Sequence, residues 1–493
     1  MIDYLLVIPV LLPLAAGGIM LLSPAKNRKL FLWSAETVVV INSILVWALL
    51  LTGTGRENGV VLLHLSPELK VILRPDGTGS VFAGLVAFLW PLAMLYAFEY
   101  MEHDIRQRSF FAFYVMTYGV TLGIALSGSL LSLYLFYEML TLVTFPLVLH
   151  YRDADSRKAA RKYLYYSIGG AAFGFLGLVF VLSVGGSSDF VQGGVPALRE
   201  AVESRDLLLL IYVLAFAGFG VKAALFPVQK WLPSASVAPT PVTALLHAVA
   251  VVKAGAFAII RLTYFSFGPD MLRGTWAQYT VGGLALFTIA YGSTMACKEI
   301  HFKKRLAYST IANLSYVLMG CCMMSEAGLF AALSHLVIHA IMKICAFFCA
   351  GAVMHKADRH HVYELNGLGR RMPVTFACFT IAGLSLTGMP LFAGFISKWN
   401  LAMAALTEGT VFGIIAVCVL LYSALMTGIY MMTVVVRAYF PGRGFDYNTL
   451  KEIRDPTWRM LLPIGLFAAL LILLGVWSGP LMNFLTAVAK GVL

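Results

Sequence analysis

The chain has 493 residues, of which 60% are hydrophobic and only 12% are charged, about half the charged fraction of a soluble globular protein. This composition excludes a soluble enzyme. The 36 Lys and Arg against 24 Asp and Glu give a net charge of +12, which is typical of proteins that meet nucleic acid, an anionic surface or a membrane.

Long apolar runs fill most of the sequence. Runs of about 18 or more apolar residues are transmembrane candidates, and runs this evenly apolar favour helices over barrel strands. Fourteen lie between charged or Gly/Pro-rich breaks, at residues 2–23, 30–53, 78–98, 109–127, 130–150, 163–185, 207–229, 238–261, 276–296, 306–325, 328–354, 373–400, 410–436 and 460–478. The sequence predicts an all-α polytopic membrane protein with about 14 transmembrane helices.

The basic residues predict the orientation of these spans. Short loops on the inner side of a membrane hold an excess of Lys and Arg. With the N-terminus outside, the inner loops hold most of them, including Arg152, Arg157, Lys158, Arg161 and Lys162 in one loop. The membrane topology therefore explains the excess of positive charge. We expect a multi-pass protein of the cell membrane that binds no nucleic acid.

Two short segments lie outside the predicted spans. In residues 59–76, apolar and polar residues alternate on both sides of Ser66 and Pro67. This pattern indicates either a small hairpin or an interfacial loop on the outer face. The apolar tail after Pro480 is too short to cross a membrane, so we expect it at the interface.

Signatures of redox, nucleotide or metal chemistry are missing from the sequence. The seven cysteines form no CxxC pair, and there is no GxxxxGK[ST], no HExxH and no Gly-rich dinucleotide loop. We expect no metal and no cofactor on this chain.

Ionisable side chains inside the spans are the candidate functional residues. Each costs about 2.5–3.5 kcal/mol on insertion scales, so such residues commonly mark ion pathways. Lys398 closes the twelfth span toward its outer end. The other members are Glu138 in the fifth span, Lys222 in the seventh, Lys253 and His247 in the eighth, and His335, His339 and Lys343, which recur every four residues in the eleventh and form one helical stripe.

Structural roles are the alternatives for these residues. Glu138 and Lys222 could form only an ion pair between helices, and His335, His339 and His247 could serve only as hydrogen-bonding groups between helices. Glu36 is about two turns from the inner end of the second span, and we expect it at the interface.

The seventh and twelfth spans resemble each other. Each has Gly, then a Pro/Gly break, then Lys-Trp (GFGVKAALFPVQKW and TGMPLFAGFISKW), and they run in opposite directions. This pattern predicts broken helices 7 and 12 in two inverted five-helix repeats. The predicted units are three helices and the outer hairpin in 1–107, helices 4–8 in 108–263, helices 9–13 in 276–440, and the last helix and tail in 441–493.

Three separated motifs resemble one protein family. FPVQKWLPSASVAPTPVTALLHAVAVVKAG, LYLFYEMLTLVTFPLVLHY and LSLTGMPLFAGFISKW are similar to helices of the proton-conducting, antiporter-like membrane subunits of respiratory complex I, Mrp cation/proton antiporters and membrane-bound hydrogenases. The resemblance covers residues 70–440. It implies fourteen helices and a horizontal chain of charged residues along the middle of the membrane.

The resemblance also implies roles for single residues. Glu138 matches the glutamate of the fifth helix and Lys222 the lysine of the seventh, a pair thought to open and close. Lys253 matches the connecting lysine of the eighth helix, and Lys398 the terminal residue of the twelfth. His335, His339 and Lys343 have parallels in the family, whereas the segment around Gln229 and Lys230 departs from it, since His is common there.

The function implied is proton translocation, with Na⁺ left open, by an antiporter-like subunit of an Mrp-type or membrane-bound hydrogenase complex. The chain would then be no enzyme by itself, and its partners would be other membrane subunits, the lipid bilayer and, in some complexes, a soluble redox arm. One alternative is a proton-pumping subunit like M or N of NADH-quinone oxidoreductase. Another is a passive structural anchor, and a third is a transporter of a small solute.

Overall fold

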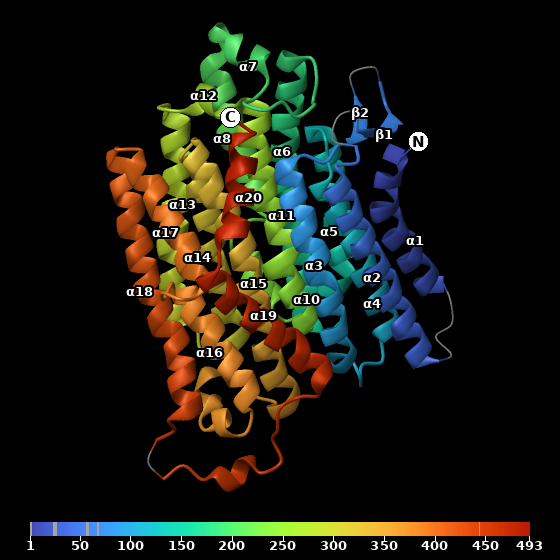
Figure 1. The fold of residues 1–493 in the computed structure, drawn as a ribbon, viewed down its shortest axis with the longest axis vertical. Coiled ribbons are helices and arrows are strands. Elements are labelled where there is room, and N and C mark those ends of the chain that lie inside the picture. The colour runs from blue at the N-terminus through green and yellow to red at the C-terminus, as the bar shows by residue number, and fades with distance from the viewer. Residues whose placement is uncertain (1, 23–26, 56–58, 67–68, 443) are drawn as a thin grey trace.

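The computed structural model describes residues 2–22, 27–55, 59–66, 69–442 and 444–493. Most of them lie in helices that run roughly side by side, with one small hairpin at an end of the bundle (Figure 1). Both termini lie toward that end (Figure 1). The predicted helical class is confirmed, while Pro67 of the predicted turn lies outside the described residues.

The N-terminal part packs three helices beside the hairpin. Val60 pairs with Leu73 across the antiparallel strands, so the predicted hairpin is confirmed. The side chain of Asp76 accepts a hydrogen bond from the Gly79 backbone N–H at 2.8 Å, which begins the third α-helix. The elements are η1 (Ile2–Val7), α1 (Ile8–Leu22), α2 (Arg28–Thr52), β1 (Val60–His64), β2 (Lys70–Leu73) and α3 (Gly77–Tyr100).

The next part combines long helices with one interrupted segment. Its elements are α4 (Gln107–Ala125), α5 (Leu130–Val148), α6 (Ala154–Gly185), α7 (Pro196–Glu200), η2 (Val202–Ser204), α8 (Arg205–Gly220), α9 (Trp231–Ala235), α10 (Thr240–Ala244), η3 (Leu245–Val249), α11 (Val251–Arg261) and η4 (Leu262–Phe267). Ser129 and Asp153 are the N-caps of α5 and α6. Turns replace regular helix between α8 and α9, whereas helical backbone continues from Thr240 to Phe267 with π-helical turns at η3 and η4.

The last part has a second interrupted segment. Its elements are α12 (Pro269–Leu272), α13 (Trp276–Lys298), α14 (Phe302–Cys322), α15 (Glu326–Ala357), η5 (Val362–Leu365), η6 (Leu368–Arg370), α16 (Pro373–Thr387), α17 (Ala393–Thr407), α18 (Val411–Tyr439), η7 (Tyr447–Leu450), α19 (Trp458–Val476) and α20 (Gly479–Lys490). Gly388 ends α16 with a φ of 91°, a conformation that suits glycine. Leu391, in the following turn, is 70% exposed.

Ten helices of the described chain are long and apolar enough to cross a membrane, and each coincides with one of the predicted spans. The other predicted spans correspond to α4, α8, α14 and the pair α16 and α17. Large apolar side chains on the outside of the bundle, such as Ile44 on α2 and Leu425 on α18, are exposed. The chain is thus a multi-pass membrane protein, while the count of fourteen and the inverted repeats stay predictions.

Two helical segments form the centre of the bundle. Within Thr240–Phe267 and Glu326–Ala357, the most apolar windows are completely buried, whereas those of α2 and α18 are mostly accessible. The central segments carry most of the ionisable residues singled out in the sequence. The fold therefore places those residues where neighbouring helices, not lipid, surround them.

The C-terminal tail forms α20, which packs against α15 and α3 and runs toward the hairpin end of the bundle (Figure 1). Val488 lies against Gly77 at the start of α3, and Gly475 near the end of α19 lies against Leu391. The apolar face with Leu485 is buried against these helices, while the interfacial position of the tail stays a prediction.

Candidate functional site

Lys222 lies just after the end of α8 and is completely buried. Its ammonium donates to the backbone carbonyl of Tyr137 on α5 and lies 3.3 Å from the centroid of the Tyr137 ring. Gly255 of α11 permits this packing, because a Cβ there would lie 2.5 Å from the Ala223 backbone nitrogen and 3.0 Å from the Lys222 Cβ. The break after α8 thus places Lys222 between α5 and α11.

Glu138 follows Tyr137 on α5 and is half-buried. Its Oε1 is buried and has no hydrogen-bond partner among the described residues. Glu138 and Lys222 are within electrostatic range, but no ion pair of 4.0 Å or shorter joins them. Lys222 instead contacts the carbonyl and ring of Tyr137, the residue that precedes Glu138.

A direct contact between side chains joins the two central segments. The Nζ of Lys253 on α11 lies 2.8 Å from Nδ1 of His339 on α15. The rings of His339 and His335 are stacked, with centroids 5.7 Å apart and an interplanar angle of 11°. The Nδ1 of His335 lies 3.0 Å from the Ser397 hydroxyl oxygen on α17. These two hydrogen bonds and the stacked histidines between them form a polar series from α11 to α17.

Lys398 is the next residue after Ser397 and is 5% exposed. Its Nζ donates to the carbonyls of Leu386 at 2.6 Å and Thr387 at 3.1 Å, which are the last residues of α16. The C-terminal end of a helix carries partial negative charge, so the half-helix supplies the counter-charge for this ammonium.

The position predicted for Lys398 in its span is wrong. It lies in the first half of α17, next to the break, and α17 continues to Thr407. The reason is the interruption from Gly388 to Phe392, which ends α16 early and starts a new helix.

Lys343 and His247 flank this series. The Nζ of Lys343 donates to the carbonyl of Leu306 on α14 at 3.1 Å. His247 lies in the π-helical turn η3, and its ring centroid is 4.9 Å from that of Phe347. Neither of its ring nitrogens has a hydrogen-bond partner within the part of the chain that the structure describes. π-Helical turns inside α-helices are frequent at functional sites.

Three buried residues at the site are not among those predicted from the sequence: Tyr137, Ser397 and Lys303. Lys303 lies in the first turn of α14, where its Nζ donates to the Ala238 carbonyl at 2.9 Å. Contacts between helices leave no periodic pattern in a sequence. For Tyr137 and Ser397, the available indication was that they are the residues next to Glu138 and Lys398.

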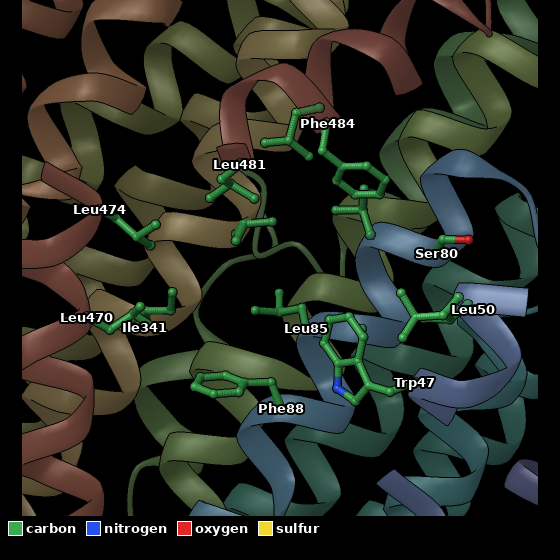
Figure 2. Close-up of a pocket in the computed structure, with 15 residues that line it drawn as sticks. Trp47, Leu50, Ser80, Leu85, Phe88, Ile341, Leu470, Leu474, Leu481 and Phe484 are labelled. Carbon is green, nitrogen blue, oxygen red and sulfur yellow. The ribbon is translucent and has the colours of Figure 1, made fainter. Parts of the chain in front are cut away.

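A separate cavity of about 480 Å³ lies beside α15, between α2, α3, α19 and α20 (Figure 2). Mostly apolar side chains line it, including Trp47, Phe88 and Phe484. Ile341 of α15 also points into it, and because Ile341 follows His339 by two residues, the cavity and the histidines are on opposite sides of the helix. This cavity is therefore distinct from the polar series.

Comparison with known proteins identifies the family. Residues 127–425 match the family described as NADH:quinone oxidoreductase/Mrp antiporter, TM. NADH-quinone oxidoreductase subunit N of Desulforudis audaxviator is 30% identical over 478 residues, which are 95% of this chain and 93% of that protein. A component of a probable K⁺/H⁺ antiporter of Rhizobium meliloti is 31% identical over 483 residues, 96% of this chain but 47% of that longer protein.

A solved structure shows the same fold. A chain of the membrane-bound sulfane sulfur reductase, an archaeal respiratory membrane complex, superimposes with a TM-score of 0.86 at 21% identity, covering 99% of this chain and 97% of that one. The chain belongs to the NADH:quinone oxidoreductase/Mrp antiporter family of membrane subunits.

Proposed function

We propose that the chain translocates protons across the cell membrane, with its N-terminus outside, as an antiporter-like subunit of a multi-subunit Mrp-type or membrane-bound hydrogenase complex. The family and its relatives support ion translocation in general. The path runs from Glu138 and Lys222 through Lys253, His339 and His335 to Lys398, with Lys343 and His247 beside it.

The contact between Lys253 and His339 carries this proposal. An ammonium can donate to the bare Nδ1 of a neutral imidazole, and a neutral amine can accept from a protonated Nδ1. The same 2.8 Å geometry therefore fits the proton on either partner. A purely structural pair would more usually join lysine to a carboxylate, and no carboxylate lies within 4.0 Å of Lys253 among the described residues.

Glu138 controls the charge of Lys222 in this proposal. A carboxylate that approaches an amine favours its charged form, and one that withdraws favours proton release. Lys222 is held by the carbonyl and ring of Tyr137, so Glu138 is able to change its distance without detaching the lysine. The energy for that change comes from a partner, which in a redox complex is an arm that binds the electron donor.

Lys398 supplies the test. Arginine keeps the positive charge and can still donate to the Leu386 and Thr387 carbonyls, but it holds its proton under ordinary conditions. We expect Lys398→Arg to assemble normally, as judged by native gels, and to abolish acidification of inverted membrane vesicles. The control is Arg199→Lys, which changes an exposed residue that pairs with Asp270. Full transport in Lys398→Arg would refute a proton-carrying role and favour a structural anchor.

A second candidate is a subunit like N of NADH-quinone oxidoreductase. The match to almost the full length of such a subunit favours it, whereas the antiporter relative is about twice as long. Purification of the tagged chain from its own membranes distinguishes the candidates, since the host complex is identified by mass spectrometry of the co-purified subunits. Co-purification of an NADH-binding arm with the chain would support this second candidate.

A further inference from the structure

A second group of buried polar side chains lies apart from the polar series, where α2, α3 and α4 meet. Glu36 was expected at the interface, and it is only 9% exposed. Its Oε2, the Trp90 Nε1 and the Tyr114 hydroxyl are all buried and have no hydrogen-bond partner among the described residues. The interfacial depth of Glu36 stays a prediction, whereas its burial within the bundle is observed.

Ring contacts join Trp90 to two tyrosines of α4. The ring centroids of Trp90 and Tyr114 are 5.6 Å apart, and those of Trp90 and Tyr118 are 5.0 Å apart. Glu36 is within electrostatic range of Tyr114. The Tyr118 hydroxyl lies 2.7 Å from the Ser43 hydroxyl, one and a half to two turns along α2 from Glu36. The six residues of this α2–α4 cluster are Glu36, Asn42, Ser43, Trp90, Tyr114 and Tyr118.

The Glu36 carboxyl group has no ion-pair partner in the described part of the chain, where no basic group lies within 4.0 Å of its oxygens. Arg28, at the start of the same helix, is engaged with Gln107, the Phe98 carbonyl and Glu102. A buried carboxylate without a counter-charge is costly, so burial favours the neutral acid at this position.

Ionisable groups on the surrounding helices do not change this conclusion. On α4, Tyr114 and Tyr118 face the cluster, whereas Arg108 bonds the Met20 and Leu21 carbonyls. On α3, Tyr96 donates to the Phe348 carbonyl, and Glu99 binds Lys356 and Thr457. Tyr100 of α3 accepts from Thr240, and α1 has no ionisable side chain.

We propose that Glu36 is a second proton-binding site, separate from the polar series, in which a protonated carboxyl group is linked by ordered water to Trp90 and Tyr114. The Glu36 Oε2, the Trp90 Nε1 and the Tyr114 hydroxyl are the buried groups without a partner to which such a water would bond. The ligand is a proton and not a metal cation, because Trp90 offers only an N–H donor, which a cation would repel. The site does not depend on the proposed proton series.

A lipophilic carbodiimide tests this proposal on the intact protein in its membrane. Dicyclohexylcarbodiimide reacts with protonated carboxyl groups: the acid proton moves to one nitrogen, the oxygen bonds to the central carbon, and the acyl group then shifts to nitrogen, so no atom is lost. Near neutral pH exposed carboxyl groups are ionised. We expect mass spectrometry to find the adduct on Glu36 at about tenfold or more the level on Glu102, whose side chain is 44% exposed.

Two controls complete the experiment. Glu36→Gln should abolish the adduct on that peptide and leave the melting temperature close to that of the wild type, because glutamine resembles the neutral acid. Excess Na⁺ or K⁺ should not protect Glu36. Equal modification of Glu36 and Glu102 would overturn the proposal, and protection by Na⁺ or K⁺ would overturn it in favour of a cation site. The comparison of labelling at Glu36 and Glu102 uses the wild-type chain. It therefore tests the proposal even if the Glu36→Gln variant fails to fold.

Discussion

The Nζ of Lys253 and the Nδ1 of His339 are 2.8 Å apart, although the residues are 86 positions apart in the chain. Both side chains are completely buried, and they come from the two central segments of the bundle. The contact therefore joins α11 to α15 at the beginning of the polar series.

The first prediction concerns His339. His339→Gln keeps a polar group near Lys253 but cannot carry a proton, so we expect transport in inverted vesicles to fall by about tenfold or more while assembly is unchanged. His360→Gln is the matched control, since that histidine is 48% exposed at its side chain and lies outside the helices. Equal transport in both variants would show that protons bypass His339.

The second prediction concerns the ring below Lys222. Tyr137→Phe keeps the ring and the backbone carbonyl and loses only the hydrogen bond from the Tyr137 hydroxyl to the Phe219 carbonyl at 3.3 Å. Tyr137→Leu also removes the ring on which the ammonium lies. We expect near-normal transport with Phe and a strong loss with Leu, measured in the same vesicles. A harmless Tyr137→Leu would show that the ring has no part in holding Lys222.

The third prediction concerns the close approach at Gly255. Alanine there would overlap the Ala223 nitrogen and the Lys222 side chain, and overpacking of this kind costs about 1–3 kcal/mol. Gly283→Ala is the control, because nothing lies within 4 Å of an added Cβ there and alanine favours helix. We expect Gly255→Ala to lower the melting temperature in detergent and Gly283→Ala to keep or raise it. The reverse order would contradict the packing described.

The fourth prediction concerns Asp76, the N-cap just outside α3. Burial alone would raise the pKa of this carboxyl, but the charge and hydrogen bonds of Arg261 outweigh burial and lower the pKa below its usual value. A lowered pKa means that the carboxylate stabilises the fold at neutral pH and that this stabilisation is lost as the pH falls through the lowered pKa.

Asp76→Asn should therefore destabilise the protein by about 3 kcal/mol at neutral pH, because it leaves the buried Arg261 unpaired. The difference from the wild type should shrink as the pH falls through the lowered pKa of Asp76, because the wild-type carboxyl then also becomes neutral. Thermal unfolding in detergent at several pH values measures it. A difference that does not change with pH would mean that the capping hydrogen bonds, not the charge, stabilise this end of α3.

Sequence patterns predicted the features that repeat along a helix. The apolar runs coincide with helices, the four-residue spacing placed His335 and His339 on one face, and Gly and Pro marked the interruptions around Lys222 and Lys398. Such features depend on residues that are close together in the sequence, so a sequence pattern can reveal them.

Contacts between distant segments could not be predicted in the same way. The hydrogen bond from Lys253 to His339 depends on which faces of α11 and α15 meet, and no periodicity within one helix records that. The burial of Glu36 could not be predicted for the same reason, since its distance from the end of α2 says nothing about the helices that cover it. The packing of α20 against α15 and α3 could not be predicted either, since the length of the tail after Pro480 does not indicate which helices it contacts.

The groups that hold Lys398 are main-chain carbonyls, which limits the mutations that can remove them. A codon change can replace a side-chain counter-ion, but it cannot delete the oxygens of Leu386 and Thr387. A mutational screen for lost transport should therefore find no acidic partner for Lys398. Its hits should fall on Lys398 itself and on positions such as Gly388 and Pro390, which fix the path of the chain and thereby decide where those oxygens point.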